Sequence, residues 1–356
     1  MSAAIEYTWP EVSLIGVAAL AVTALVTRLV RRLAVAHGVL DIPNARSSHT
    51  TATPRGGGLA IVVTATAGMI LLALLGAMPI DAVLAASGGG IAVAIVGFLD
   101  DRFSVPPSIR FAVHIAAAVW AVMSLGGLPP MRIGAHLMQL GWAGQVLAVL
   151  GIVWTLNLFN FMDGIDGIAA SEAGFITGSG ALLTLLEAGS PDVLAAGLMF
   201  CAACSGFLLW NWPPAKIFMG DVGSGYVGYV IAVLGLTATR ANPSAIWAWL
   251  ILGGAFFVDA TVTLVRRLLR GERVHEAHRS HAYQWLARRW GSHRSVTVSV
   301  LMLNLLWLLP CAVLASIRPD EATWIAAGAL APVVVLAIAA GSGRREIQAS
   351  DAGISS

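Results

Sequence analysis

Residues 82–102 read AVLAASGGGIAVAIVGFLDDR, an uncharged run that ends in two aspartates and an arginine. The eighteen residues before Asp100 carry no charge, and a helix of about that length crosses the roughly 30 Å of hydrocarbon in a bilayer. The segment therefore predicts a transmembrane helix whose charged end, Asp100-Asp101-Arg102, reaches one face of the membrane.

The composition of the whole chain supports this interpretation. The 356 residues are 58% hydrophobic and only 11% charged, whereas a soluble domain has roughly 25% charged residues. The 21 basic and 19 acidic side chains could not cover the surface of a soluble protein of this size. Backbone polar groups in hydrocarbon must be satisfied within the segment, which favours helices. We therefore predict an all-α polytopic membrane protein.

Apolar stretches long enough to span a bilayer recur along the chain. We predict about eleven transmembrane helices, at residues 11–33, 57–77, 82–99, 109–126, 143–161, 167–186, 192–210, 222–239, 245–265, 296–316 and 322–340. Together they form a single membrane-embedded domain, residues 1–340. Residues 341–356 form a polar cytoplasmic tail that we expect to be disordered.

The distribution of basic residues predicts the orientation of these helices. With the N-terminus outside, eighteen of the 21 lysines and arginines fall on the inner side, and only Arg132, Arg240 and Arg318 fall outside. Cytoplasmic loops carry an excess of Lys and Arg. We therefore expect the N-terminus outside and the C-terminus in the cytoplasm.

Five aspartates flank predicted spans on that same inner side: Asp100, Asp101, Asp163, Asp166 and Asp221. Each one taken alone could be a helix-end charge in contact with water. Acidic groups beside a bilayer core are costly and tend to be functional, and these five lie in only three segments, all containing glycine. Adjacent carboxylates such as Asp100 and Asp101 repel each other unless they share a proton or a divalent cation. The pattern favours a site.

Two of these segments combine carboxylates with other polar groups. In NLFNFMDGIDG, residues 157–167, the polar residues Asn157, Asn160, Asp163 and Asp166 are spaced by threes, which makes them neighbours on a helix surface. In NWPPAKIFMGDVGSG, residues 211–225, a double proline ends one helix and a glycine-rich turn opens the next. Free N–H groups at such a turn suit phosphate, and Asp221 among them suits a bridging metal ion.

Two basic loops face the same side. One is DIPNARSSHTTATPRGGG, residues 41–58, and the other is HEAHRSHAYQ, residues 275–284. Three histidines within seven residues could bind zinc, but only Glu276 and no cysteine accompanies them, which favours contacts with anions. Mg²⁺ binds through one or two carboxylates and substrate phosphates, and cations stabilise transferring phosphoryl groups. The parts together indicate a metal-dependent phosphotransferase that joins a soluble diphosphate to a membrane lipid.

These segments resemble those of the polyprenyl-phosphate N-acetylhexosamine-1-phosphate transferase family, whose members start O-antigen, enterobacterial common antigen, teichoic acid and peptidoglycan lipid intermediates. The matching pieces are DIPNARSSHTTATPRGGG, FLDDR, NLFNFMDGIDG, NWPPAKIFMGDVGSGYVG and HRSHAYQ. The resemblance implies transfer of an N-acetyl sugar 1-phosphate from a UDP-sugar to undecaprenyl (polyprenyl) phosphate, with UMP released. It also implies Mg²⁺ or Mn²⁺ as cofactor, a bacterial inner membrane location with a cytoplasmic active site, a possible homodimer and no nucleic-acid partner.

The resemblance also assigns roles to residues. Asp221 is expected to be the principal Mg²⁺ ligand, with Asp101 supporting the metal and the phosphate. Asp100 is expected to deprotonate or orient the polyprenyl phosphate. The expected catalytic set is Asp100, Asp101, Asp163, Asp166, His278 and His281. The expected substrate-binding set is Arg46, His49, Thr53, Asn160, Asn211, Phe218 and Arg279, with Asn211 and Phe218 near the uracil.

One departure from the family pattern concerns the sugar. Many members carry consecutive histidines where this chain reads His278-Arg279-Ser280-His281. HRSHAYQ is more similar to the branch that transfers N-acetylfucosamine or N-acetylquinovosamine in O-antigen synthesis, so the sugar stays open. Because a phosphate monoester has a second pKa of about 6, the nucleophile is mostly ionised, which favours a single displacement.

Two other functions were weighed. A cation-coupled lipid or sugar transporter would place its carboxylates near the bilayer midplane. Only Asp259 lies well within a predicted span, where it could instead form a hydrogen bond between helices near Thr263. A CDP-alcohol phosphotransferase would have arginine at position 170, which is alanine here.

Overall fold

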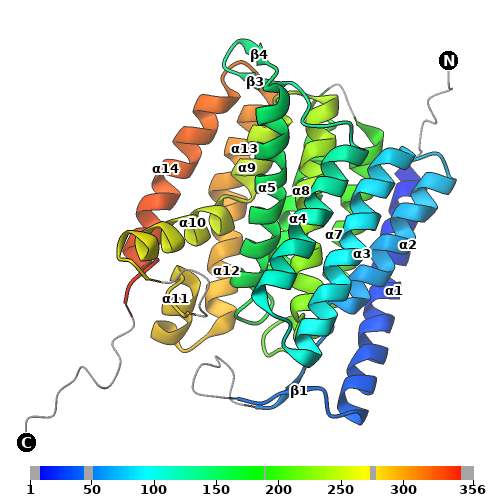
Figure 1. Cartoon of the computed structure of the whole chain (residues 1–356), viewed down its shortest axis with the longest axis vertical. Helices are drawn as coiled ribbons and strands as arrows, with labels where there is room; N and C mark the ends of the chain where they lie inside the picture. Colours follow the sequence, from blue (N-terminus) through cyan, green and yellow to red (C-terminus); the bar gives the residue numbers. More distant parts are fainter. Residues whose placement is uncertain (1–8, 44–50, 188–189, 273–277, 346–356) are drawn as a thin grey trace, which may run out of the picture.

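The computed structural model describes residues 9–43, 51–187, 190–272 and 278–345. The chain is a bundle of helices with two short strand pairs (Figure 1). The first seven helices are α1 Trp9–Ala36, α2 Leu59–Leu74, α3 Ile80–Phe103, α4 Pro107–Ser124, α5 Gly141–Met162, α6 Ile168–Leu183 and α7 Pro191–Asn211. They are followed by α8 Asp221–Ala241, α9 Ala245–Leu252, α10 Gly254–Leu269, α11 Ala282–Trp290, α12 His293–Leu303, the π-helix η1 Asn304–Leu308, α13 Leu309–Ile317 and α14 Ala322–Ala340.

The all-α membrane architecture is confirmed. Eight helical segments in the described part of the chain are long and apolar enough to cross a membrane, and a ninth is obtained if α9 and α10 count as one bent span. Helices α2 and α6 are apolar but only 16 residues long. All eleven predicted spans therefore coincide with helices, although the structure does not establish eleven crossings.

The predicted span 245–265 is not one straight helix. It breaks at Gly253 between α9 and α10, and the two pieces are bent by 72°. Glycine is a common cause of sharp helix bends, and two glycines stand together here. As a result α10 runs across the bundle rather than along it (Figure 1).

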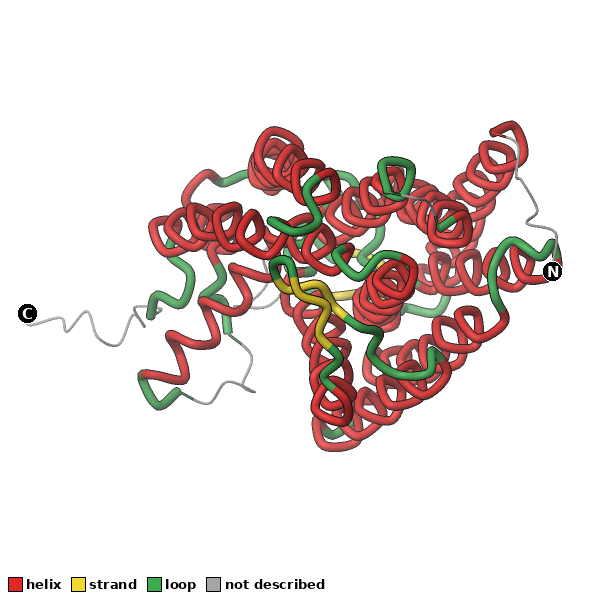
Figure 2. Tube along the Cα trace, turned by 90° about the horizontal axis from the view of Figure 1, so that it is seen from above, coloured by secondary structure: helices red, strands yellow, loops and turns green. Residues whose placement is uncertain are grey.

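Helix α8 is the centre of the bundle, and 17 of its 21 residues are buried. It packs between α3 and α5, and small residues allow the close approach: a Cβ at Gly89 would lie 1.9 Å from the Tyr229 hydroxyl. That hydroxyl donates to the carbonyl of Ala85 at 2.6 Å. Seen from above, many of the helices are viewed nearly end-on and lie side by side (Figure 2). The burial of α8 holds its first residue, Asp221, in a defined place.

The strand pairs lie at opposite ends of the bundle (Figure 1). Strands β1 Leu40–Asp41 and β2 Thr53–Pro54 pair antiparallel at the end where α3 and α5 finish and α8 begins, and β3 Met131–Ile133 pairs with β4 His136–Met138 at the other end. The first pair returns the loop after α1 to the start of α2.

The domain extends beyond its predicted boundary at residue 340. The structure describes residues up to 345, and Ser342 is fully buried, because its hydroxyl donates to Asp259 at 2.6 Å. The predicted hydrogen bond of Asp259 between helices is present, because Asp259 accepts the N–H of Ala282 of α11 at 2.9 Å; Thr263 of its own helix also donates to it, at 3.2 Å. The rest of the predicted tail, residues 346–356, lies outside the described residues.

Candidate active site

The loop that follows β2 is joined to the loop before α8 by backbone hydrogen bonds. The N–H of Phe218 donates to the carbonyl of Pro54 at 2.8 Å, and the N–H of Gly57 donates to Phe218 at 2.9 Å. The two backbones touch at Gly58 and Gly223, since a Cβ at Gly58 would lie 2.3 Å from the Cα of Gly223. Two segments far apart in sequence thus form one scaffold, which carries Arg55 to the start of α8.

The carboxylate of Asp101 holds the N-terminus of α8. Its Oδ1 accepts the N–H of Asp221 at 2.9 Å and its Oδ2 accepts the N–H of Val222 at 3.1 Å. These are backbone donors that a helix start leaves without internal partners. Glycine is required around the contact: Gly220 has a φ of 76°, and a Cβ at Gly97 would lie 2.4 Å from the carbonyl oxygen of Asp221. Asp101 and Asp221 are therefore adjacent by construction.

Two arginines link the three carboxylates. The guanidinium of Arg55 contacts Asp101 through Nε at 2.8 Å and Asp221 through Nη2 at 2.6 Å. Arg110 of α4 donates to Asp100, and its Nη1 lies 3.5 Å from the other oxygen of Asp221. Asp221 thus sits between two guanidinium groups at the centre of the cluster.

A fourth carboxylate, Asp163, follows the last residue of α5. Desolvation raises the pKa of Asp163 well above its usual value; Arg55 opposes the shift, whereas Asp221, Asp101 and Asp166 add to it. Desolvation and the neighbouring carboxylates thus disfavour negative charge at Asp163. A divalent cation near the cluster would offset that charge, and carboxylate oxygens are the hard donors that such a cation prefers.

No group of three or more His, Cys, Asp or Glu side chains that could hold a metal ion by itself occurs in the described parts of the chain. A Mg²⁺ site does not require such a group, because Mg²⁺ retains waters and uses one or two carboxylates together with substrate phosphates. Asp221, the predicted principal ligand, would hold it together with one carboxylate of the Asp100–Asp101 pair. Both carboxylates of that pair already accept hydrogen bonds, Asp100 from Val105 and Arg110 and Asp101 from the start of α8.

The turn between α5 and α6 places Asp166 beside a residue that the sequence did not suggest. The Nδ1 of His293, the first residue of α12, lies 3.3 Å from Oδ1 of Asp166. The other carboxylate oxygen, Oδ2, accepts the N–H of Ala215 at 3.0 Å. Asn160, one turn before Asp163, donates to the hydroxyl of Ser224 at 3.0 Å. Two of the polar residues spaced by threes, Asn160 and Asp166, therefore link the end of α5 and the turn after it to α8, α12 and the double-proline loop.

Asn211 has a framework position. It is 3% exposed, its amide donates to the carbonyl of Ile217 at 3.0 Å, and its Oδ1 accepts the N–H of Gly167 at 3.0 Å. It fixes the double-proline loop against the Asp166 turn. Both ends of its amide are used in these bonds, so Asn211 would act on a nucleotide by positioning the two loops.

A polar cavity of about 430 Å³ opens beside this turn. It brings together Thr53, Asp166 and Phe218, three of the residues predicted to meet the nucleotide sugar. His293 and Arg294 line its other side. The predicted contacts Arg46 and His49 lie outside the described residues.

The loop that contains His278 and His281, called the histidine loop below, leads into α11. The rings of His278 and His281 are 4.9 Å apart, and His281 is only 1% exposed. The hydroxyl of Tyr283 donates to the carbonyl of Phe161 at 2.9 Å, which brings α11 against the end of α5. Arg279 is half-buried between the two histidines. The loop thus leads to a helix that packs against the Asp163 turn.

A second cavity, of about 620 Å³, reaches the same cluster from the bundle. Its walls are mainly apolar side chains of α3, α4, α5 and α8, and its polar lining comes from Arg110, His114, Asn157, Asn160 and Asp221. An apolar cavity with an arginine and a carboxylate at one end suits a lipid that carries a phosphate.

Comparison with known proteins identifies the family. A sequence model of the family described as glycosyl transferase family 4 matches residues 83–239. A Bacillus subtilis (strain 168) protein described as a probable undecaprenyl-phosphate N-acetylglucosaminyl 1-phosphate transferase is 30% identical over 300 residues, which cover 82% of each chain. The chain belongs to this family of polyprenyl-phosphate sugar-phosphate transferases.

Other relatives of the transferase agree. A decaprenyl-phosphate N-acetylglucosaminephosphotransferase of Mycobacterium tuberculosis (strain ATCC 25618 / H37Rv) is 30% identical over 330 residues, covering 82% of this chain and 80% of the relative. A phospho-N-acetylmuramoyl-pentapeptide-transferase of Gloeothece citriformis (strain PCC 7424) is 31% identical over 229 residues, or 58% of each chain. The predicted family is confirmed, and the chain is an enzyme.

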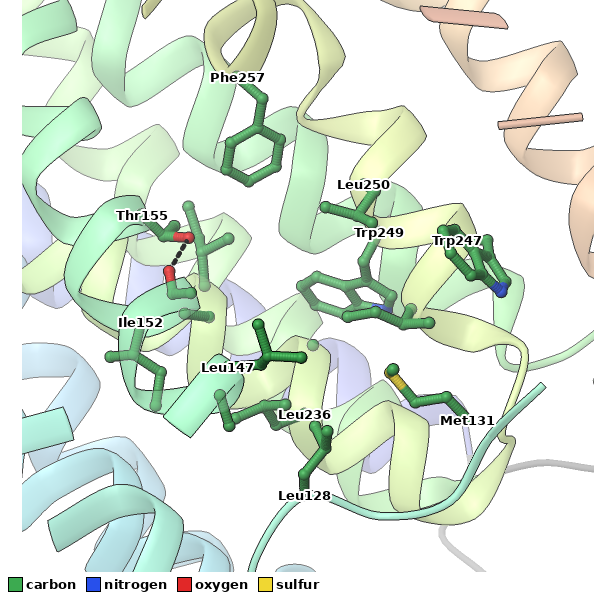
Figure 3. Close-up of a pocket in the computed structure, with 16 residues that line it drawn as sticks. Leu128, Met131, Leu147, Ile152, Thr155, Leu236, Trp247, Trp249, Leu250 and Phe257 are labelled. Carbon is green, nitrogen blue, oxygen red and sulfur yellow. Dashed lines mark hydrogen bonds between the residues drawn. The ribbon is translucent and has the colours of Figure 1, made fainter. Parts of the chain in front are cut away.

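The transferase has a further cavity, of about 260 Å³, on the other side of α5 (Figure 3). Trp249 of α9 and Leu147 of α5 point into it, and Thr155 bonds to the carbonyl of Gly151 at 2.8 Å. None of its lining residues is ionisable. It therefore offers no group for phosphate chemistry.

Arg55, Arg110 and His293 are functional candidates that are absent from the predicted site residues. The sequence shows Arg55 only as part of a basic loop, and nothing in the neighbours of Arg110 along the chain marks its ion pair with Asp100. A weak signal existed, because Arg110 follows the aspartate pair at the start of the next span. For His293 no such signal is present.

Proposed function

We propose that this transferase moves an N-acetylhexosamine 1-phosphate from a UDP-sugar to undecaprenyl or another polyprenyl phosphate, with release of UMP. The reaction belongs at the cytoplasmic face of the bacterial inner membrane and begins the synthesis of O-antigen or another envelope polysaccharide. The relatives are described as acting on undecaprenyl or decaprenyl phosphate, which supports the lipid.

The observation that carries this proposal is that Asp221 is linked through its partners to two unlike cavities. Asp221 lines the apolar cavity with Arg110, and Arg55, its other partner, belongs to the loop whose Thr53 lines the polar cavity. An apolar cavity suits a polyprenyl chain, and a polar cavity with the aromatic ring of Phe218 suits a nucleotide. The two phosphates would then meet at the carboxylate cluster.

Arg110 is placed to bind the lipid phosphate. Its Nε is buried and has no hydrogen-bond partner among the described residues, while Nη1 holds Asp100. A phosphate at the mouth of the apolar cavity would receive that donor. The lipid phosphate is mostly ionised near neutral pH, so the main task of Asp100 is to position Arg110 and the nucleophile.

The reaction is an exchange of phosphoanhydrides. An oxygen of the lipid phosphate attacks the phosphorus attached to the sugar, the new P–O bond forms, and the bond to the UMP oxygen breaks. Arg55 and Arg110 stabilise the charge that accumulates on the transferred group. Mg²⁺ held by Asp221 and one carboxylate of the Asp100–Asp101 pair would supply further neutralisation of that charge. One phosphoanhydride replaces another, so the equilibrium constant is near one.

The test is a transfer assay on membranes that contain the protein. Undecaprenyl phosphate, Mg²⁺ and a panel of labelled UDP-N-acetyl sugars are added, and lipid product and UMP are measured with and without EDTA. We expect product with at least one sugar, sensitivity to EDTA, and loss of turnover in Asp221→Asn at an unchanged protein level. Absence of product with every sugar would refute the proposal, and a trapped phosphorylated Asp100 would refute the single displacement.

A further inference from the structure

Asp259 of α10 is a buried carboxylate outside the proposed reaction centre, and it binds groups from two other parts of the chain. It is 5% exposed. Its Oδ1 accepts the N–H of Ala282 at 2.9 Å and the hydroxyl of Ser342 at 2.6 Å, and its Oδ2 accepts the N–H of Tyr283 at 3.3 Å. Asp259 therefore serves as the N-terminal cap of α11, supplied by another helix.

The segment after α14 completes this arrangement. The N–H of Gly343 donates to the carbonyl of Ser280 at 2.6 Å, and Arg266 of α10 donates to the carbonyl of Ser342 at 2.6 Å. Gly343 has a φ of 70°, and a Cβ there would lie 2.9 Å from that of Arg266. Residues 341–343 thus lie across the histidine loop, with backbone and side-chain bonds on both sides.

The arrangement reaches the reaction centre through α11. His281 precedes α11 and stacks between His278 and Tyr283, at ring distances of 4.9 and 5.8 Å. The Tyr283 hydroxyl bonds to Phe161, and it fits only because residue 164 is glycine, where a Cβ would lie 2.1 Å from it. The start of α11 is therefore held between Asp259 on one side and the Asp163 turn on the other.

We propose that Asp259 and Ser342 are positioning residues for the transfer reaction, and that the segment after the last helix clamps the histidine loop against the Asp163 turn. The inference rests on the proposed function, because it assigns the effect of the clamp to turnover. The clamp acts on His281 and Tyr283. It does not include the residues of α3, α4 and α8 that line the apolar cavity. Loss of the clamp should therefore lower kcat and leave the KM for polyprenyl phosphate unchanged.

Two shortened chains make a matched pair. A chain that ends at residue 345 retains every contact described above, whereas a chain that ends at residue 340 lacks Ser342 and Gly343. We expect wild-type kcat for the first and a loss on the order of 100-fold for the second, the size that a misplacement of about 1 Å can produce. Equal kcat values in the two chains would overturn the proposal.

Point substitutions decide the matter if the shorter chain does not accumulate in the membrane. Ser342→Ala removes the hydroxyl donor, and we expect a fall in kcat that Ser342→Thr restores. Thr263→Val is the matched control, because Thr263 donates to the same Oδ1 of Asp259 from within α10 and does not touch the histidine loop. The same kcat in Ser342→Ala and Thr263→Val would contradict the clamp.

A proteolysis assay separates failure of the clamp from failure of the proposed function. Trypsin cleaves after Arg279, which precedes α11, and after Arg288, which lies in the last turn of α11. We expect faster cleavage there in Ser342→Ala than in wild type or Thr263→Val, whether or not the transfer assay detects product. Unchanged cleavage would overturn the clamp even if the wild-type protein transfers sugar phosphate.

Discussion

Asp101 and Asp221 are 120 positions apart in the chain, and the backbone N–H of Asp221 donates to the Asp101 carboxylate at 2.9 Å. This contact divides the work of the adjacent aspartates. Asp101 is 7% exposed and is bound by α8 and Arg55, while Asp100 faces Arg110 at the apolar cavity. Asp101 therefore holds the start of α8 in place, whereas Asp100 binds Arg110, a residue that lines the apolar cavity.

Asp101→Asn should therefore reduce stability as well as activity. The substitution replaces one acceptor oxygen with a donor that faces the N–H groups at the start of α8, and it breaks the ion pair with Arg55. An unsatisfied buried donor costs about 1–3 kcal/mol, so thermal unfolding in detergent should occur at a lower temperature. The control is Asp320→Asn, since Asp320 is 63% exposed and an exposed ion pair contributes roughly 0–1 kcal/mol. Equal effects of the two substitutions would contradict this role.

Arg55→Lys should abolish most of the turnover although it preserves the charge. Arg55 contacts Asp101 through one nitrogen and Asp221 through another, and the single ammonium group of lysine cannot reproduce that fork. We expect UMP release to fall by about 100-fold, as for other small misplacements. Arg102→Lys is the control, because Arg102 is exposed at the end of the same cluster and its substitution should leave turnover within about twofold. Full activity in Arg55→Lys would show that the bridge is dispensable.

Asp163→Asn should stabilise the metal-free protein while it inactivates the enzyme. Desolvation raises the pKa of Asp163 in the folded protein. The contribution of Asp163 to the free energy of unfolding is therefore most favourable below the unfolded-state pKa of about 4, and it declines as the pH rises from there through the raised folded-state pKa. The Asp163→Asn variant does not ionise at this position. Its unfolding temperature, measured in detergent with EDTA, should thus match wild type at acid pH and exceed it increasingly toward alkaline pH. A gain that shrinks as the pH rises would contradict the sign of the shift, and Asp320→Asn should show no gain.

His293→Ala should weaken binding of the nucleotide sugar and leave lipid binding intact. His293 lies 3.3 Å from Asp166 and lines the polar cavity, and it is absent from the lining of the apolar one. A hydrogen bond to a charged group is worth about 1.5–3 kcal/mol, so KM for the UDP-sugar should rise by roughly tenfold or more. His136→Ala, at the exposed β3–β4 hairpin, serves as the control. A rise in the KM for polyprenyl phosphate instead would contradict the proposal that the polar cavity binds the nucleotide sugar and the apolar cavity binds the lipid.

Hydropathy located the helices because it reports the length of apolar runs. All eleven predicted spans coincide with helices, yet the run at 245–265 is apolar on both sides of Gly253, and its bend depends on what α9 and α10 pack against. The count of crossings therefore could not be settled from composition. The twin glycines were the only local indication of the bend.

The carboxylates of the site were predictable because charge next to a bilayer core is rare. Their partners were harder to predict. Arg110 pairs with Asp100 only because α4 packs beside α3, and Asn211 is buried only because two loops close over it. Ser342 lies in a segment whose composition resembles a loose tail, and a buried acceptor contributed by α10 holds it in place. Such pairings come from tertiary structure, and local sequence does not specify them.

The bond from Ser342 to Asp259 has a consequence for biosynthesis of the protein. Every helix of the bundle leaves the ribosome before Ser342 does, so all the carboxylates of the site can be in the membrane while the histidine loop still lacks its last restraint. A nascent chain that stalls earlier, or one shortened by a protease at residue 340, inserts without that restraint. Under the proposed clamp, only a chain completed through Ser342 is competent for transfer, and unfinished copies would not draw on the polyprenyl phosphate of the cell.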